Sequence, residues 1–172
     1  QNGVDSAVVT ALTILARIDA DNKLYGKEEQ LDVTFVADQT EVYFGICGDE
    51  ERYIPVVLAP AFEKLLGEGA FLRQMGSRFL MTDTAYEHLA GKDSYAGRYI
   101  GRLKNTDLDL GLYDIYDDRS AEQIRLMKQT RHAFDKAMEL YEKGFYYEAK
   151  NLYACVLREN PGDMAAKYYI FR

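Results

Sequence analysis

The spacing of apolar residues over the first twenty positions predicts an amphipathic helix. Apolar residues recur every three or four positions from Val4 to Ile18, which places them on one face of a helix with 3.6 residues per turn. Asn22 and Gly26 then interrupt the pattern. We therefore expect a helix over residues 4–21.

Alternation of apolar and polar residues follows, which is typical of half-buried strands. Residues 31–35 and 42–46 both alternate in this way, and Asp38-Gln39 lies between them as a turn. We expect these two runs to pair as a β-hairpin. The next apolar run, residues 57–66, has a helical composition and is followed by glycines, so we expect a helix there.

Three further strands are predicted over residues 78–82, 96–103 and 109–116. Asp83 is expected to cap a short helix that ends near Leu89, because its carboxylate can accept a hydrogen bond from a free backbone N–H.

The pattern becomes purely helical after residue 118. Ser120 with Gln123 resembles a capping box, which marks the start of a helix. We place a domain boundary at this change, with one domain over residues 1–118 and a helical extension over residues 119–172.

Two helices and the start of a third are expected in this extension. Gly144 interrupts the apolar periodicity, and Asn160-Pro161 ends the second helix. The small Ala149 would allow close contact between the two helices. The pattern resembles one tetratricopeptide-type helical hairpin, a unit that cannot bury both of its own faces and therefore needs a neighbour.

Charge and composition narrow the classes of partner. The formal net charge is −7, and an acidic excess argues against nucleic-acid binding, which depends on Lys and Arg. Cys47 and Cys155 lie far apart without metal-ligand spacing, so we expect free thiols in the core of a protein from a reducing compartment.

The expected location is the cytoplasm, since no apolar run approaches the ~18 residues that a membrane span needs. The chain begins without Met, which suggests a fragment of a longer protein. Any membrane attachment would then come from missing upstream segments.

One continuous stretch resembles a known enzyme family. Residues 39–48 lie where class III nucleotide cyclases usually carry Thr-Gly, four variable residues, Gly, one residue and Ile-Gly. Gly45 and Gly48 match, whereas the Thr-Gly pair is absent. An acidic segment with an arginine follows at residues 49–52. Because residues 45–82 fit the family pattern without a gap, the chain resembles the second half of an adenylate or guanylate cyclase domain.

The positions that carry the chemistry of that family are replaced. The family Asp that helps read the purine falls on Pro60, the Asn that orients the ribose on Glu63, and the Arg that neutralises phosphate charge on Gly67. Glycine supplies no charge to a phosphoryl transition state, and glutamate places an anion beside an anionic nucleotide. The resemblance thus implies catalytic and nucleotide-binding positions that are not intact.

The fold implied by this resemblance is α+β, a ferredoxin-like class III nucleotide cyclase fold followed by a C-terminal α-helical hairpin. It would be partial here, because the family's N-terminal strands and metal-binding aspartates lie upstream of residue 1. No metal site and no cofactor are expected in this fragment.

Three functions remain open at this point. The leading hypothesis is a degenerate cyclase-homology domain with a regulatory or dimer-assembly role in signal transduction. The alternative is a genuine cyclase subunit that shares an active site with a partner chain and uses Mg²⁺ or Mn²⁺. The third is a scaffold that works mainly through its C-terminal helices.

Association is expected to be the common feature, as a homodimer or as a heterodimer with another cyclase domain. Two groups of residues are the candidate partner surface: Val57, Leu58, Phe62 and Leu65 on the expected dimer-arm helix, and Tyr141, Tyr146, Tyr147 and Tyr153 on the helical extension.

Overall fold

The chain folds as an α+β protein with a mixed sheet. The computed structural model describes residues 3–49, 51–59, 65, 69–103 and 109–172. Its elements, in chain order, are α1 (Gly3–Asn22), a 3₁₀ turn (Lys27–Glu29), β1 (Phe35–Ala37), β2 (Tyr43–Gly48), β3 (Tyr53–Leu58), α3 (Gly69–Gln74), β4 (Phe79–Thr82), α4 (Asp83–Glu87), a second 3₁₀ turn (Lys92–Ser94), β5 (Gly97–Leu103), β6 (Leu110–Ile115), α5 (Ala121–Glu142), α6 (Tyr146–Glu159) and α7 (Met164–Ile170).

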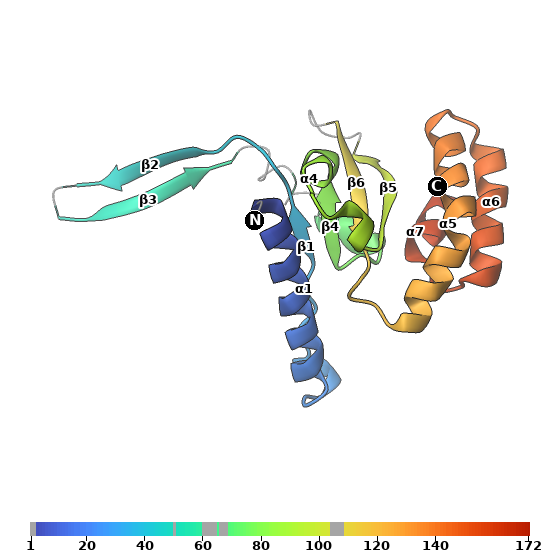
Figure 1. The fold of residues 1–172 in the computed structure, drawn as a ribbon, viewed down its shortest axis with the longest axis horizontal. Helices are drawn as coiled ribbons and strands as arrows, with labels where there is room; N and C mark the ends of the chain where they lie inside the picture. Colours follow the sequence, from blue (N-terminus) through green and yellow to red (C-terminus); the bar gives the residue numbers. More distant parts are fainter. Residues whose placement is uncertain (1–2, 50, 60–64, 66–68, 104–108) are drawn as a thin grey trace.

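Four of the strands form the central sheet, in the order β1-β4-β6-β5. β1 runs parallel to β4, while β6 is antiparallel to both β4 and β5. Helix α1 lies on one side of this sheet and helices α5 to α7 on the other (Figure 1).

Strand β4 shows why both faces of the sheet are covered. All four of its residues are buried, and successive side chains on a strand point to opposite faces. Phe79 and Met81 pack with residues of α1 and α4. Leu80 packs in a second core with Phe134 and other residues of the helical layer. Three consecutive apolar residues, Phe79 to Met81, therefore fill both faces of the strand, as expected for a sheet that is buried on both sides.

The predicted helices at the two ends of the chain are confirmed. Helix α1 spans Gly3–Asn22, against an expectation of residues 4–21. The capping box of Ser120 and Gln123 starts α5, and Gly144 adopts a positive φ of 83° between α5 and α6. The predicted third helix is α7, whose first turn is capped by the Asp163 side chain.

The predicted hairpin between residues 31–35 and 42–46 is wrong. β1 instead pairs in parallel with β4, and β2 pairs with β3. The chain reverses after Gly48, where Asp49 accepts hydrogen bonds from the backbone N–H groups of Glu51 and Arg52. These bonds stabilise a tight turn, so β2 pairs with the segment that follows it.

Two further local predictions need correction. Val57 and Leu58, expected at the start of a helix over residues 57–66, end strand β3. The cap of α4 is Thr82, whose hydroxyl accepts from the Ala85 N–H, and not Asp83, which is the first helical residue.

The cysteines are free, as expected, but they are not core residues. Cys47 is exposed on β2 and Cys155 is half-buried on α6. All six residues of β2 are exposed, so the Cys47 thiol lies in solvent and not in a core.

Candidate functional site

The most distinctive feature of the molecule is a two-stranded arm, β2 and β3, that extends away from the central sheet (Figure 1). The arm is antiparallel and in continuous register, from Tyr43 opposite Leu58 to Gly48 opposite Tyr53. Pro55 can lie within β3 because both strands of a two-stranded ribbon are edge strands.

Both faces of the arm are apolar. Side chains alternate between faces along each strand, so Phe44 and Val57 share one face, while Tyr43 and Leu58 share the other. The structure leaves these large side chains in solvent, with Phe44 69% exposed. The exposed large apolar residues of the arm are Tyr43, Phe44, Ile46, Tyr53, Ile54, Val57 and Leu58, and Val42 just before β2 is exposed as well.

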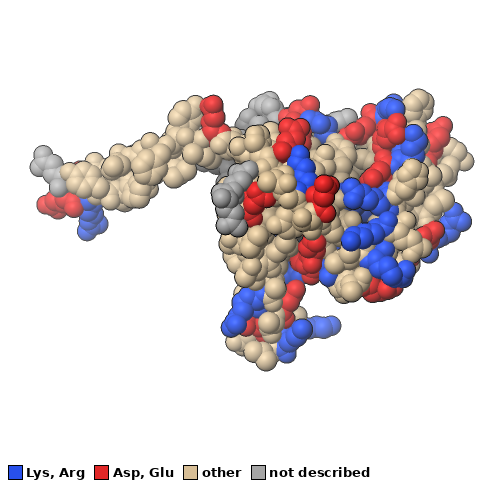
Figure 2. Space-filling view, viewed as in Figure 1, with Lys and Arg blue, Asp and Glu red and all other residues tan. Residues whose placement is uncertain are grey.

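Charge on the arm is confined to its ends. No Lys, Arg, Asp or Glu occurs in β2 or β3, and Figure 2 shows the arm as a rod without charged residues along its length and with charged residues at its tip. In the tip turn, hydrogen bonds from the backbone N–H groups of Glu51 and Arg52 lower the pKa of the Asp49 carboxyl. The tip therefore keeps a carboxylate charge even in mild acid, while the shaft is uncharged.

Such an arm is poorly suited to stand alone. An isolated two-stranded hairpin is marginally stable in water, and large exposed apolar patches on a folded protein mark interaction sites. Unpaired strand edges can in addition pair with another chain. The arrangement can therefore bury apolar surface against a partner.

The four predicted partner residues of the first group do not all lie on the surface. Val57 and Leu58 are exposed on the arm, although on a strand and not on the expected helix. Leu65 is buried in the core between the sheet and the helical layer, so it is not a surface residue. Phe62 lies outside the described residues, as do Pro60, Glu63 and Gly67, the three degenerate catalytic and nucleotide-binding positions.

The predicted tyrosine surface is only partly correct. Tyr146 and Tyr147 are exposed, and Tyr141 is half-buried. Tyr153 is fully buried, because its ring stacks on that of Tyr169 and packs edge-on against Phe134. It belongs to the core and not to a partner surface.

Sequence reasoning missed most of the arm. Tyr43, Phe44, Ile46, Tyr53 and Ile54 were not selected as partner residues, although they are among its largest exposed side chains. A signal was present: two short runs without any charge, on both sides of a Gly-Asp turn, carry large apolar residues at odd and even positions alike.

In the part of the chain that the structure describes, no group of three His, Cys, Asp or Glu side chains lies close enough together to bind a metal ion. Among the same residues, no helix has the length and apolar character needed to cross a membrane.

Comparisons of the chain with protein-family models, with curated proteins and with solved structures gave no match.

Proposed function

We propose that this chain is a degenerate class III cyclase-homology domain whose role is assembly with a second cyclase-type domain. The observation that supports this proposal is the β2–β3 arm, which carries seven large apolar side chains exposed to solvent. The resemblance over residues 45–82 supports the family, and in that family each active site is shared across a dimer.

The expected loss of cyclase activity is argued from three positions of the sequence. Pro60, Glu63 and Gly67 stand where the family has its purine-reading Asp, its ribose-orienting Asn and its phosphate-neutralising Arg. An Arg at that position stabilises charge as it develops in the transition state, and such a group is worth about 10³-fold or more in rate. The exposed apolar side chains of the arm lie at other positions, between residues 42 and 58, so assembly through the arm can persist without catalysis.

Sedimentation velocity tests the proposal, on the 172-residue chain alone and mixed with an active cyclase domain. We expect a dimer in at least one of these samples, either of the chain with itself or of the chain with the active cyclase domain. The double substitution Phe44→Lys and Val57→Lys places charge on one face of the arm and should abolish the dimer.

Leu24→Lys is the control, because Leu24 is an apolar residue outside the arm that is even more exposed than Phe44 and Val57, and its substitution should leave the dimer intact. A strict monomer under every condition would contradict an assembly role.

The alternative, a genuine cyclase subunit, is separated from this proposal by activity. With ATP or GTP and Mn²⁺ the chain should form no cyclic nucleotide. Cyclic product from the unmodified protein would overturn the degenerate assignment. If the full-length protein retains the upstream metal-binding aspartates, the double substitution Glu63→Asn and Gly67→Arg should restore some activity.

A further inference from the structure

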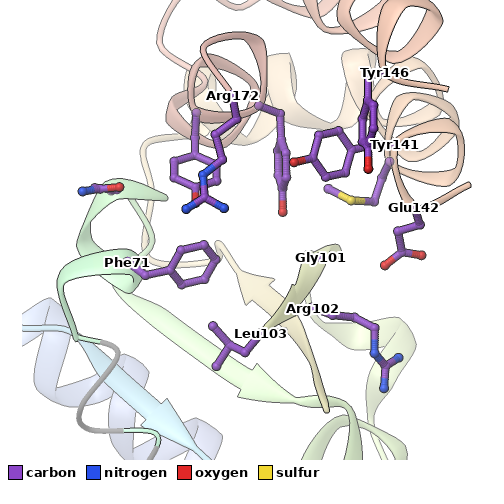
Figure 3. A pocket seen from close by; sticks show the side chains of 12 residues that line it. Phe71, Gly101, Arg102, Leu103, Tyr141, Glu142, Tyr146 and Arg172 are labelled. Carbon is purple, nitrogen blue, oxygen red and sulfur yellow. The ribbon is translucent and has the colours of Figure 1, made fainter. Parts of the chain in front are cut away.

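A cavity of about 340 Å³ lies where strand β5 meets the helical layer (Figure 3). Residues of α3, β5, α5, α6 and α7 line it, so segments before and after residue 118 both contribute. Small-molecule sites usually measure about 300–1,000 Å³. The cavity is at the small end of this range, which suits a ligand with one ring or two fused rings.

Strand β5 is irregular where it lines the cavity. Its register against β6 shifts between Tyr99 and Gly101, which is the mark of an inserted residue. Gly101 has a φ of 118°, and an added Cβ there would lie 2.1 Å from the Tyr169 hydroxyl. The glycine therefore allows this hydroxyl to donate to the Ile100 carbonyl, at 2.6 Å. Bulges and glycines within strands recur beside binding sites, and this one fixes a ring of the cavity wall.

One wall of the cavity is a continuous series of aromatic rings. The series runs through Phe71, Tyr168, Tyr169, Tyr141 and Tyr146, with ring centroids 5.4, 5.2, 4.7 and 5.1 Å apart in that order. Successive rings meet edge to face, a geometry that the charge distribution of aromatic rings favours. The wall is therefore held in place by its own contacts and presents rings to a ligand.

Arg172 supplies positive charge at one end of the cavity. Its guanidinium lies over the Tyr168 ring, 4.9 Å from the centroid. Among the described residues, no Asp or Glu side chain pairs with Arg172, so its charge is available to an anion. A guanidinium can bind one carboxylate through two parallel hydrogen bonds.

The opposite end of the cavity does not attract an anion. Glu142 lies there, across from Arg172 (Figure 3), and its carboxylate accepts a hydrogen bond from the Tyr99 hydroxyl. The neighbouring Arg102 is paired with two carboxylates, those of Asp109 at 2.6 Å and Asp83 at 3.3 Å. Among the described residues that line the cavity, Arg172 is therefore the anchor for a negative group.

We propose that this cavity binds an aromatic monocarboxylate, a molecule with one flat ring system and one carboxylate. The ring system packs against the aromatic wall, and the carboxylate binds Arg172. Glu142 repels a second anionic group at the other end, so a single carboxylate fits and its direction is set. The inference does not depend on the assembly role, and either can fail without the other.

Indole-3-acetate is a suitable probe. The chain contains no tryptophan, so indole fluorescence from an added ligand is measured against little emission from the protein. We expect saturable binding to the 172-residue chain. Indole-3-acetamide has the same shape without the charge and should bind about tenfold more weakly, the loss expected for one charge-assisted hydrogen bond. Tryptamine, which carries an ammonium group instead, should bind at least as weakly as the amide.

Two substitutions test which end of the cavity holds the carboxylate. Arg172→Gln should weaken indole-3-acetate about tenfold and leave indole-3-acetamide nearly unchanged. Glu142→Gln should not weaken indole-3-acetate, because glutamine can still accept from the Tyr99 hydroxyl and no longer repels the anion. Arg17→Gln is the matched control for Arg172, since Arg17 is an exposed arginine of α1 that does not line the cavity.

A second pair of substitutions tests the aromatic wall. Tyr146 and Tyr147 are adjacent on α6 and both exposed, at 61% and 76%, but only Tyr146 lines the cavity. Tyr146→Ala should weaken indole-3-acetate about two- to tenfold, the range for one aromatic contact, and Tyr147→Ala should leave its affinity unchanged. Absence of saturable binding, equal or tighter binding of the amide or of tryptamine, or equal effects of the two tyrosine substitutions would overturn the proposal.

Discussion

Arg98 is the residue that connects the sheet most directly to the helical layer. It is buried on β5, and its two terminal nitrogens donate to both carboxylate oxygens of Asp163, at 2.6 and 2.9 Å. Asp163 also caps α7 by accepting from the Ala166 N–H. The Arg98 guanidinium lies 4.1 Å from the centroid of the Phe134 ring. One side chain thus orients a strand, a helix cap and a core aromatic residue.

We predict that Arg98→Met destabilises the chain by about 3–5 kcal/mol, because it leaves the buried Asp163 carboxylate without its partner. Denaturant unfolding of the 172-residue chain measures this. Arg125→Met, which removes the exposed pair with Glu122, should leave the unfolding midpoint nearly unchanged. Similar midpoints for the two variants would contradict the role of Arg98.

At Asp118, unlike at Arg98, the free-energy cost of burying the charge outweighs the stabilisation from its ion pair. Its carboxyl is 2% exposed, 3.3 Å from Arg78. Burial raises the pKa of Asp118, with an added contribution from Asp114, although Arg119 and Arg78 oppose the shift. A carboxyl with a raised pKa binds its proton more tightly in the folded state, so its charge costs stability at neutral pH and the cost disappears as the pH falls through the raised pKa.

Asp118→Asn should therefore increase the free energy of unfolding at neutral pH, and the difference from the natural chain should shrink in acid. Urea unfolding at several pH values measures both effects. A less stable Asn variant at neutral pH would show instead that the pairing with Arg78 outweighs the cost of burial.

At the scale of elements, Gly144 controls the turn between α5 and α6. Its φ of 83° lies in the left-handed region, which costs other residues about 1–2 kcal/mol. An added Cβ would meet no atom within 4 Å there, so strain would come from the backbone alone. Gly144→Ala should thus destabilise by about 1 kcal/mol.

Gly26 supplies a matched control for this substitution. An added Cβ is equally unobstructed there, but φ is −66°. Gly26→Ala should be neutral or stabilising by about 0.4–1 kcal/mol, because alanine restricts the unfolded chain. Equal effects at the two glycines, measured by thermal unfolding, would contradict the argument from backbone conformation.

Elements with a strong local signal could be predicted from the sequence. The 3.6-residue periodicity located α1 and the capping pattern located the start of α5, while β5 and β6 lie within the strands predicted over residues 96–103 and 109–116. These features depend on neighbouring residues alone, so one sequence carries them.

Strand pairing could not be predicted in the same way. Residues 42–46 were recognised as a strand, but their partner depends on whether the turn at Asp38 or the turn at Asp49 closes a hairpin. Val57 and Leu58 are apolar and precede a run of helical composition in the sequence, and short apolar runs of this kind do not distinguish strand from helix. Only the register of β2 with β3 resolves both points.

At the scale of the whole molecule, the segments before and after residue 118 share one core. Leu80, Ile100 and Leu112 of the sheet pack with Phe134 and Tyr153 of the helical layer. The arm is the contrary case, since all but one of the side chains in β2 and β3 are exposed. The fold should therefore depend on the C-terminal helices and tolerate loss of the arm.

Two deletions test this dependence. A chain that ends at Asp118 would expose the sheet face that packs with the helices, and we expect it to lose cooperative unfolding and to bind an apolar dye. A chain in which a short glycine linker replaces residues 43–58 should keep cooperative unfolding with little change in midpoint, because the arm contributes no residue to any buried cluster among the described residues. Cooperative unfolding of the chain that ends at Asp118 would show that the sheet is stable without the helices. Loss of cooperative unfolding in the chain without the arm would show that the arm stabilises the fold. That result would contradict the interpretation of the arm as a surface whose role is to bind a partner.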